Sequence, residues 1–117
     1  MQQQYEQQAA LFKLFTHPAR LAILEVLRQG EACVCHMEAV LGFRQAYISQ
    51  QLAVLREGGI IQDRREGWNI YYSVRDPRVF EVLAVVENLL EPGLGQKYPS
   101  APPQDCSCPK CSSLREA

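Results

Sequence analysis

The sequence predicts a mainly α-helical domain with one β-hairpin, arranged as a winged helix-turn-helix. Two short helical stretches, about 34–41 and about 44–57, are separated by only a few residues. Two β-prone runs follow directly, with Gly67 between them. A closely spaced pair of helices that leads straight into a hairpin is typical of this fold.

The length and composition fit one compact domain. The chain has 117 residues, 47% of its side chains are hydrophobic, and its net charge is −1. Wholesale disorder is therefore excluded, while the net charge says nothing for or against a nucleic-acid partner. No apolar run approaches the ~20 residues of a membrane-spanning helix, and the first residues lack the pattern of a signal peptide. We expect a cytoplasmic protein without a membrane partner.

Two helices are expected before the helix pair. The first runs from about Tyr5 to Phe15 and carries apolar side chains at helical spacing. The second opens at Thr16-His17-Pro18, which reads as a capping side chain followed by a proline in the first turn. A stop near Gly30 and four apolar residues within the stretch make this a core helix.

The second helix of the pair has two distinct faces. Ile48, Leu52 and Leu55 fall within a narrow arc at about 100° per residue and are expected to face the core. The opposite side is small or polar and carries no charge. Glutamine can bond adenine with two hydrogen bonds, and serine can bond phosphate or a base edge, so this face suits DNA; an uncharged solvated face is the alternative. Its residues are Ala46, Ser49, Gln50 and Ala53, with Tyr47 to one side.

The two β-prone runs, 60–66 and 69–74, are expected to form the hairpin of the fold. Gly67 lies between them in a short turn. Arg64 and Arg65, near the tip, are placed to meet a phosphate backbone. The alternative is an ordinary solvated hairpin with two basic residues.

The last expected helix runs from about Arg78 to Glu91 and is apolar well beyond one face. So small a domain can hardly cover both sides of such a helix, and we expect it to form a two-fold dimer interface together with the first helix. Burial within its own monomer is the alternative. Beyond it, prolines and glycines predict a flexible tail over 92–117.

Five cysteines lie in two groups far apart in the sequence. An odd number in a reducing compartment favours metal, metalloid or redox chemistry over a disulfide framework. The tail group places three thiols within six residues, and thiolates are soft ligands for arsenic(III), Cd(II), Pb(II), Cu(I) or Zn(II). The spacing of its last two cysteines is that of half a zinc knuckle, but no second half follows. The tail group consists of Cys106, Cys108 and Cys111.

The other group is the segment Cys33-Val34-Cys35. On a regular helix two such residues diverge by about 200°, whereas in an extended segment they point the same way. Three arrangements are open: the pair lies at a non-helical helix entry, ligation distorts the turn, or only one thiol binds. One or both could also be small buried hydrophobic residues.

Three segments resemble the ArsR/SmtB family of winged-helix repressors over about residues 9–90. Residues 31–37 (EACVCHM) resemble its metal-box signature ELCVCDL, residues 45–60 resemble its recognition helix, and residues 17–24 are similar to its second-helix opening. His36 replaces the usual aspartate and Ala32 the usual leucine, and the last helix lacks the ligands of the zinc-sensing branch. The resemblance implies a homodimer that leaves its operator on binding a metal or metalloid. It also implies major-groove contacts from Gln45, Tyr47, Ser49, Gln50 and Gln51.

Together these observations predict a winged-helix DNA-binding and dimerisation domain over 1–91 and a cysteine-containing tail over 92–117. The expected activity is repression of transcription on double-stranded operator DNA, relieved by a thiophilic ion, with arsenite first and Cd(II) or Pb(II) next. The expected ligands are Cys33 and/or Cys35 with thiols of the tail. A redox or persulfide sensor with the same cysteines, and a module that does not bind DNA and has a structural zinc tail, remain alternatives. No arrangement of catalytic residues or phosphate loop indicates an enzyme.

Overall fold

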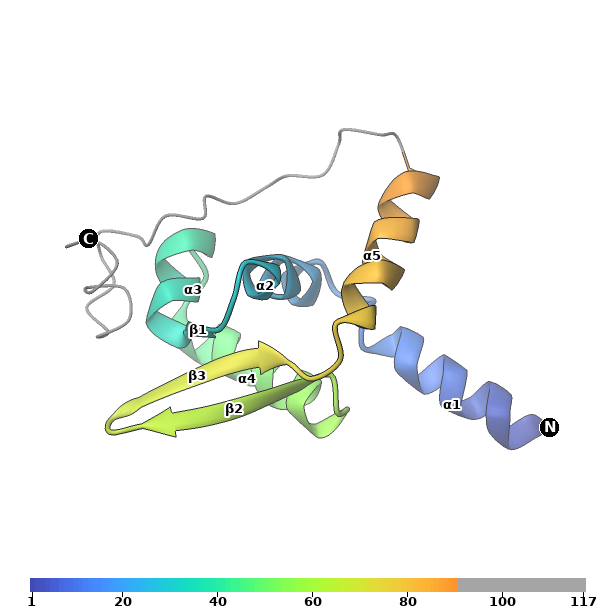
Figure 1. Ribbon diagram of the computed structural model, residues 1–117, viewed down its shortest axis with the longest axis horizontal. Helices are drawn as coiled ribbons and strands as arrows, with labels where there is room; N and C mark the ends of the chain where they lie inside the picture. Colours follow the sequence, from blue (N-terminus) through green and yellow to red (C-terminus); the bar gives the residue numbers. More distant parts are fainter. Residues whose placement is uncertain (91–117) are drawn as a thin grey trace.

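The computed structural model describes residues 1–90, which form five helices and a three-stranded sheet (Figure 1). The predicted fold class is confirmed. The predicted tail, with Cys106, Cys108 and Cys111, lies outside the described residues. The elements are α1 (Gln2–Lys13), α2 (Pro18–Arg28), β1 (Ala32–Cys33), α3 (Val34–Leu41), α4 (Gln45–Glu57), β2 (Ile61–Glu66), β3 (Asn69–Val74) and α5 (Arg78–Leu89).

The core lies where α2, α3 and α4 meet the base of the β2–β3 hairpin, which we call the wing. The predicted inward arc of α4 is correct, because all three of its apolar residues are at most 1% exposed. The tip of the wing projects away from this core, and α1 and α5 lie at the other end of the long axis (Figure 1). The largest fully buried side chains are Ile23, Leu24, Met37, Ile48, Leu52, Leu55 and Ile61.

The start of α2 differs from the sequence-based expectation. Pro18 is its first residue, as predicted, but no side chain caps the helix. The Thr16 hydroxyl instead donates a hydrogen bond to the Lys13 carbonyl at 2.8 Å, closing the end of α1. The helix pair α3–α4 is joined through Gly42, whose φ of 76° is in the left-handed region that favours glycine at a helix end.

The sequence analysis missed strand β1, which has only two residues. It pairs antiparallel with β3, with Ala32 opposite Tyr72 and Cys33 opposite Tyr71, and gives the strand order β1-β3-β2. A two-residue strand leaves no alternating pattern in the sequence, so only its partner in the fold defines it. The pairing attaches the segment that carries the first cysteine to the wing.

The entry to α5 is held by a carboxylate. Asp76 accepts hydrogen bonds from the Arg78 side chain, with Nη2 at 2.6 Å from Oδ2, and from the Arg78 backbone N–H at 3.0 Å from Oδ1. These bonds lower the pKa of Asp76 to about 2. The ordinary aspartate value is about 3.9, so the folded-state pKa is depressed and the stabilisation is present above about pH 4 and lost as the pH falls towards 2.

We therefore expect Asp76→Ala to lower the melting temperature by a few degrees at pH 7. The difference from the unmodified chain should shrink as the pH is lowered from 4 to 2. Thermal unfolding followed by circular dichroism measures both effects. Asp76→Asn is the matched control because asparagine keeps an oxygen acceptor but has no charge to titrate. A deficit of Asp76→Ala that stays constant down to pH 2 would contradict this account.

Candidate nucleic-acid interface and thiol site

The exposed face of α4 contains most of the residues expected to read DNA. Burial of Ile48, Leu52 and Leu55 turns the opposite side of the helix outward, and these outward residues form one uncharged strip. Tyr47 flanks this strip and is 40% exposed, with its ring edge-on to Phe43 at 5.5 Å between centroids. The outward residues are Gln45, Ala46, Ser49, Gln50 and Ala53.

Gln51 does not belong to this strip. It is 7% exposed, and its Oε1 accepts a hydrogen bond from Arg20 Nε at 2.8 Å. Gln51 lies three residues after Ile48 and four before Leu55, which is the spacing of the buried side of a helix. The base contact expected from Gln51 stays a prediction, but in this structure its side chain is buried and engaged by Arg20. Its position relative to the two apolar residues is the signal that could have shown this.

Gln51 instead links α4 to the preceding helices. Arg20, on α2, donates through Nε to Gln51 and through Nη1 to the Lys13 carbonyl at 3.2 Å. The end of α1, the first turn of α2 and the middle of α4 are therefore joined by one guanidinium group. This fixes the orientation of α4 relative to the rest of the domain.

Gln50→Ala should therefore affect DNA binding, whereas Gln51→Ala should affect stability. Truncating Gln50 is expected to weaken operator binding by about tenfold or more, the effect of losing a base contact, without changing stability. Truncating Gln51 removes the acceptor of the Arg20 Nε–H, which leaves only the bond to the Lys13 carbonyl, and should reduce the free energy of unfolding by about 1–2 kcal/mol. Fluorescence anisotropy with promoter DNA and urea unfolding measure the two effects. If Gln51→Ala weakened binding at unchanged stability, it would be a base reader after all.

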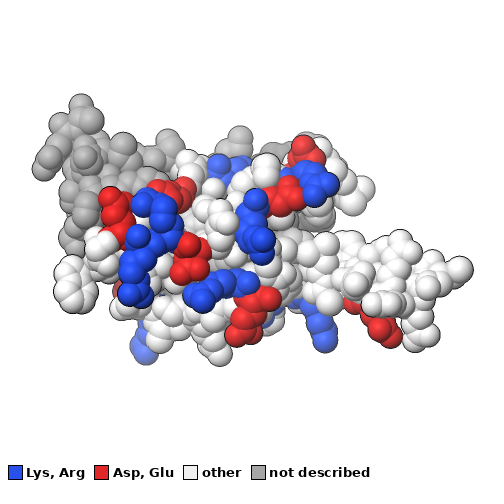
Figure 2. Space-filling model, turned by 60° about the horizontal axis from the view of Figure 1, so that its bottom comes forward, with Lys and Arg blue, Asp and Glu red and all other residues white. Residues whose placement is uncertain are grey.

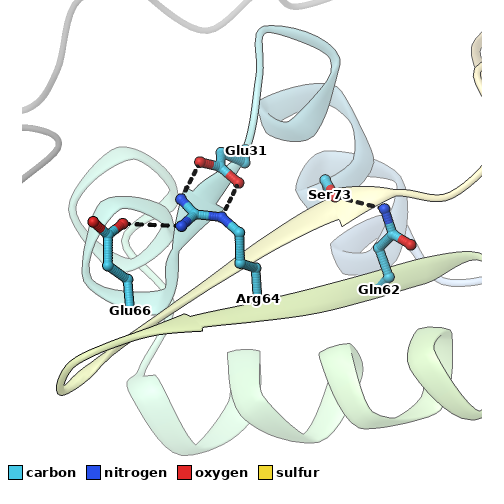
Figure 3. A network of polar contacts seen from close by, with 5 residues as sticks. All are labelled: Glu31, Gln62, Arg64, Glu66 and Ser73. Carbon is cyan, nitrogen blue, oxygen red and sulfur yellow. Dashed lines mark hydrogen bonds and ion pairs between the residues drawn. The ribbon is translucent and has the colours of Figure 1, made fainter.

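Arg64 also has a structural role. From β2 it reaches past β3 to Glu31, where Nε donates to Oε2 at 3.2 Å and Nη2 to Oε1 at 2.5 Å; Nη1 donates to Glu66 at 2.9 Å (Figure 3). Its guanidinium lies 4.9 Å from the centre of the Tyr71 ring. Hydrogen bonds to both carboxylates raise the pKa of Arg64. The phosphate contact of Arg64 stays a prediction; in this structure its half-exposed guanidinium is engaged by the two carboxylates.

Arg65 remains a candidate for the backbone contact. Side chains alternate along a strand, so Arg65 points to the opposite face of the wing from Arg64 and shares that face with Ile70, its partner in the pairing. Arg65 is exposed, and its side chain makes no hydrogen bond or ion pair within residues 1–90. On the face that bears the wing, basic and acidic side chains lie side by side rather than in one basic field (Figure 2). On this face, electrostatic attraction to DNA therefore depends on single lysine or arginine side chains rather than on a continuous positive surface.

The two described cysteines straddle a change of backbone conformation. Cys33 ends β1 with extended φ and ψ of −91° and 168°, and its Sγ accepts the His36 N–H at 3.4 Å as the cap of α3. Cys35 lies in the first turn of α3. Only Cys33 lies at the expected non-helical helix entry, and the arrangements that involve ligation stay predictions. Cys33 is 5% exposed and packs on Tyr71, whereas Cys35 is partly exposed.

Residues 1–90 contain no group of three or more cysteine, histidine, aspartate or glutamate side chains placed to hold a metal ion. Two thiols alone do not complete a three-sulfur site. A three-sulfur site that uses Cys33 and Cys35 would therefore need one further ligand from beyond the described residues or from a second chain.

A hollow of about 360 Å³ lies between the thiol segment and the exposed face of α4, and residues of both line it. Three parts of the chain border this open hollow: the segment 33–35, the start of α4 and the tip of the wing. The sequence analysis did not single out Trp68, which is fully exposed at this tip. A tryptophan in a turn carries no periodic signal, so only its position in the fold brings it into the site. The lining residues are Cys33, Val34, Cys35, Gln45, Ser49, Trp68, Asn69, Ile70 and Tyr72.

Exposed apolar side chains of the described residues gather at the other end of the molecule. Tyr5 and Phe12 on α1 are each 60% exposed, and Leu89 on α5 is 81% exposed. Four further residues of α5 and its end are also exposed, namely Val82, Val85, Val86 and Leu90. Within residues 1–90, no helix is long and apolar enough to cross a membrane.

The helix pair with an outward polar strip on its second helix, followed by the wing, defines a winged-helix regulator of transcription. Residues 17–63 match the family described as bacterial regulatory protein, arsR family. An HTH-type transcriptional regulator of Methanocaldococcus jannaschii is 43% identical over 89 residues, which are 74% of this chain and 99% of the relative. The chain belongs to the ArsR family, whose members are DNA-binding regulators and not enzymes.

Two further similarities concern the repressor fold and arsenic. The crystal structure of the transcriptional repressor BigR from Xylella fastidiosa matches with a TM-score of 0.70 and 32% identity, covering 78% of this chain and 93% of that one. An arsenic resistance transcriptional regulator of Pseudomonas putida is 48% identical over 56 residues, 48% of this chain and 43% of the relative.

Proposed function

We propose that this protein is a cytoplasmic, homodimeric repressor that leaves its operator when a thiophilic ion binds its cysteines. One observation carries the proposal: Cys33 and Cys35 line the same hollow as Gln45 and Ser49, on the outward strip of α4. An ion held by the thiols would therefore lie beside the side chains that face DNA. The similarity to an arsenic resistance regulator supports arsenite as the first candidate.

The DNA contacts are assigned to the outward strip of α4 and to the wing. Gln45, Tyr47, Ser49 and Gln50 are exposed along the first half of α4, where a helix enters a major groove. Arg65 is the proposed phosphate contact from the wing. Gln51 and Arg64 are left out because their side chains are engaged within the protein.

The ion is assigned to thiolates on chemical grounds. Arsenic(III) and the larger soft cations prefer sulfur, and arsenite takes three sulfurs in a pyramid. Cys33 and Cys35 supply at most two, so we propose that Cys106, Cys108 or Cys111 supplies the remainder. Cd(II) and Pb(II) fit a site with the same or one more thiolate and are the next candidates.

The dimer is assigned to α1 and α5. Their exposed apolar residues lie at the end opposite the tip of the wing, so a second copy could cover them without obstructing α4 (Figure 1). A two-fold dimer presents two copies of α4 to successive half-sites of an operator.

Titration of a complex between the protein and its own promoter DNA tests the function. Under reducing conditions, fluorescence anisotropy should report release of the duplex by arsenite, Cd(II) or Pb(II). The Cys33→Ser/Cys35→Ser and the Cys106→Ser/Cys108→Ser/Cys111→Ser chains should bind DNA with unchanged affinity but require at least tenfold more ion for release. If no ion releases the duplex, while peroxide or a persulfide does and mass spectrometry finds linked sulfurs, the protein is a redox sensor instead.

A further inference from the structure

We infer that the hollow is a shared site, in which a group bound to Cys35 and a DNA duplex on α4 exclude each other directly. The inference rests on the proposed function and specifies how release occurs. This mechanism differs from one in which the bound group distorts α3 and thereby moves α4. Here the bound group itself occupies the space in front of α4 that the duplex would need. The neighbours of that space are Gln45, Ser49 and Trp68.

The lining of the hollow supports a shared site. Gln45 and Ser49 are exposed residues on the outward strip of α4, and they border the same space as the thiol segment. Cys35 is the more exposed of the two thiols: Cys33 is buried against Tyr71, whereas Cys35 packs against this pair and stays partly exposed. A volume of about 360 Å³ lies within the range of small-molecule sites, so an occupant larger than a bare ion would fill space beside both α4 residues.

The wing, which borders the hollow on the other side, is bonded to the thiol segment. Cys33 pairs with Tyr71 of the wing, and Glu31 holds Arg64 of the wing through two hydrogen bonds. The wing and the segment 31–35 should therefore move as one unit. An occupant on Cys35 would therefore lie in the hollow that Trp68 of the wing and the start of α4 both border.

The exposure of Trp68 fits the same assignment. This side chain is fully exposed at the tip of the wing, yet it borders the space shared with Gln45 and Ser49. A duplex seated on the outward strip of α4 would therefore lie close to the indole. Duplex binding and thiol modification should both change the Trp68 fluorescence, which is a specific signal because the chain has one tryptophan.

Alkylation of a full-length chain that retains Cys35 as its one thiol tests the inference. The variant is Cys33→Ser/Cys106→Ser/Cys108→Ser/Cys111→Ser, in which serine can still cap α3. N-ethylmaleimide is the probe: the thiolate sulfur bonds to one alkene carbon, and the neighbouring carbon takes up a proton. Promoter duplex should slow this reaction at least tenfold, and the alkylated chain should bind duplex at least tenfold more weakly.

Two controls distinguish exclusion from other causes. Methyl methanethiosulfonate leaves a small methylthio group on the sulfur and should weaken binding less than the maleimide adduct. A chain with all five cysteines replaced by serine and a Gln62→Cys substitution has its thiol on the Arg64 face of the wing, and duplex should not protect it. Circular dichroism of each alkylated chain establishes that it remains folded.

The outcomes separate the two proposals. Equal alkylation rates with and without duplex, or an alkylated chain with unchanged affinity, would overturn the shared site while leaving ion-dependent release in place. Equal effects of the two adducts on a folded chain would also overturn it, because exclusion depends on size. If the unmodified chain did not bind promoter duplex, the proposed function and this inference would both be rejected.

Discussion

Replacing Val85 by glutamate is expected to convert the proposed dimer into a monomer and to weaken operator binding at least a hundredfold. Val85 is 59% exposed on α5, in a surface shared with Val82 and Leu89. If a second copy covers this surface, the new carboxylate is buried without a partner, which costs several kcal/mol. A monomer contacts one half-site instead of two and loses the added affinity of simultaneous engagement.

Sedimentation equilibrium and fluorescence anisotropy with promoter DNA measure this pair of effects. Val85→Leu is the matched control, since it preserves the apolar surface and should remain dimeric with unchanged affinity. Circular dichroism separates loss of the dimer from loss of the fold. A folded Val85→Glu chain that still sediments as a dimer would place the interface away from α5.

Replacing Leu52 by alanine should reduce the free energy of unfolding by about 3 kcal/mol. Leu52 is 1% exposed in the centre of the core, and truncating a buried leucine removes its transfer free energy and leaves a cavity. A domain of this size is stabilised by about 5–15 kcal/mol, so the loss is a large fraction of the total. The melting temperature should fall by more than about 10 °C.

The adjacent residue on α4 provides the control. Ala53 is exposed on the outward strip, so Ala53→Ser should change stability by less than about 0.5 kcal/mol. Urea unfolding followed by circular dichroism gives both values. Similar losses for the two substitutions would mean that α4 does not present the two faces described above.

The main elements of the fold follow from local sequence patterns. The periodicity of Ile48, Leu52 and Leu55 was enough to assign the inward face of α4, and the β-prone runs on either side of Gly67 gave the wing almost to the residue. Strand β1 could not be found in this way, because two residues have no period. The expected helix entry before Pro18 had the correct position but no side-chain cap.

The candidate site was predicted less completely than the fold. Residue type identified the thiols and the polar strip of α4, because soft sulfur ligands and uncharged amides each suit a recognisable partner. Residue type could not tell which glutamine or which arginine side chain is exposed and not engaged within the protein. Gln50 and Gln51 are chemically identical neighbours, yet one is exposed and the other accepts a hydrogen bond from Arg20.

By itself, the sequence determined the order of the helices, the wing and the chemical types of the side chains available for a site, since hydrophobic spacing and side-chain type act locally. The tertiary structure decided which of those groups are free to act. It engaged Arg64 with Glu31 and brought Trp68 and Cys35 to one hollow beside α4. Such decisions depend on contacts between residues distant in the chain, and no local pattern encodes the distance between them.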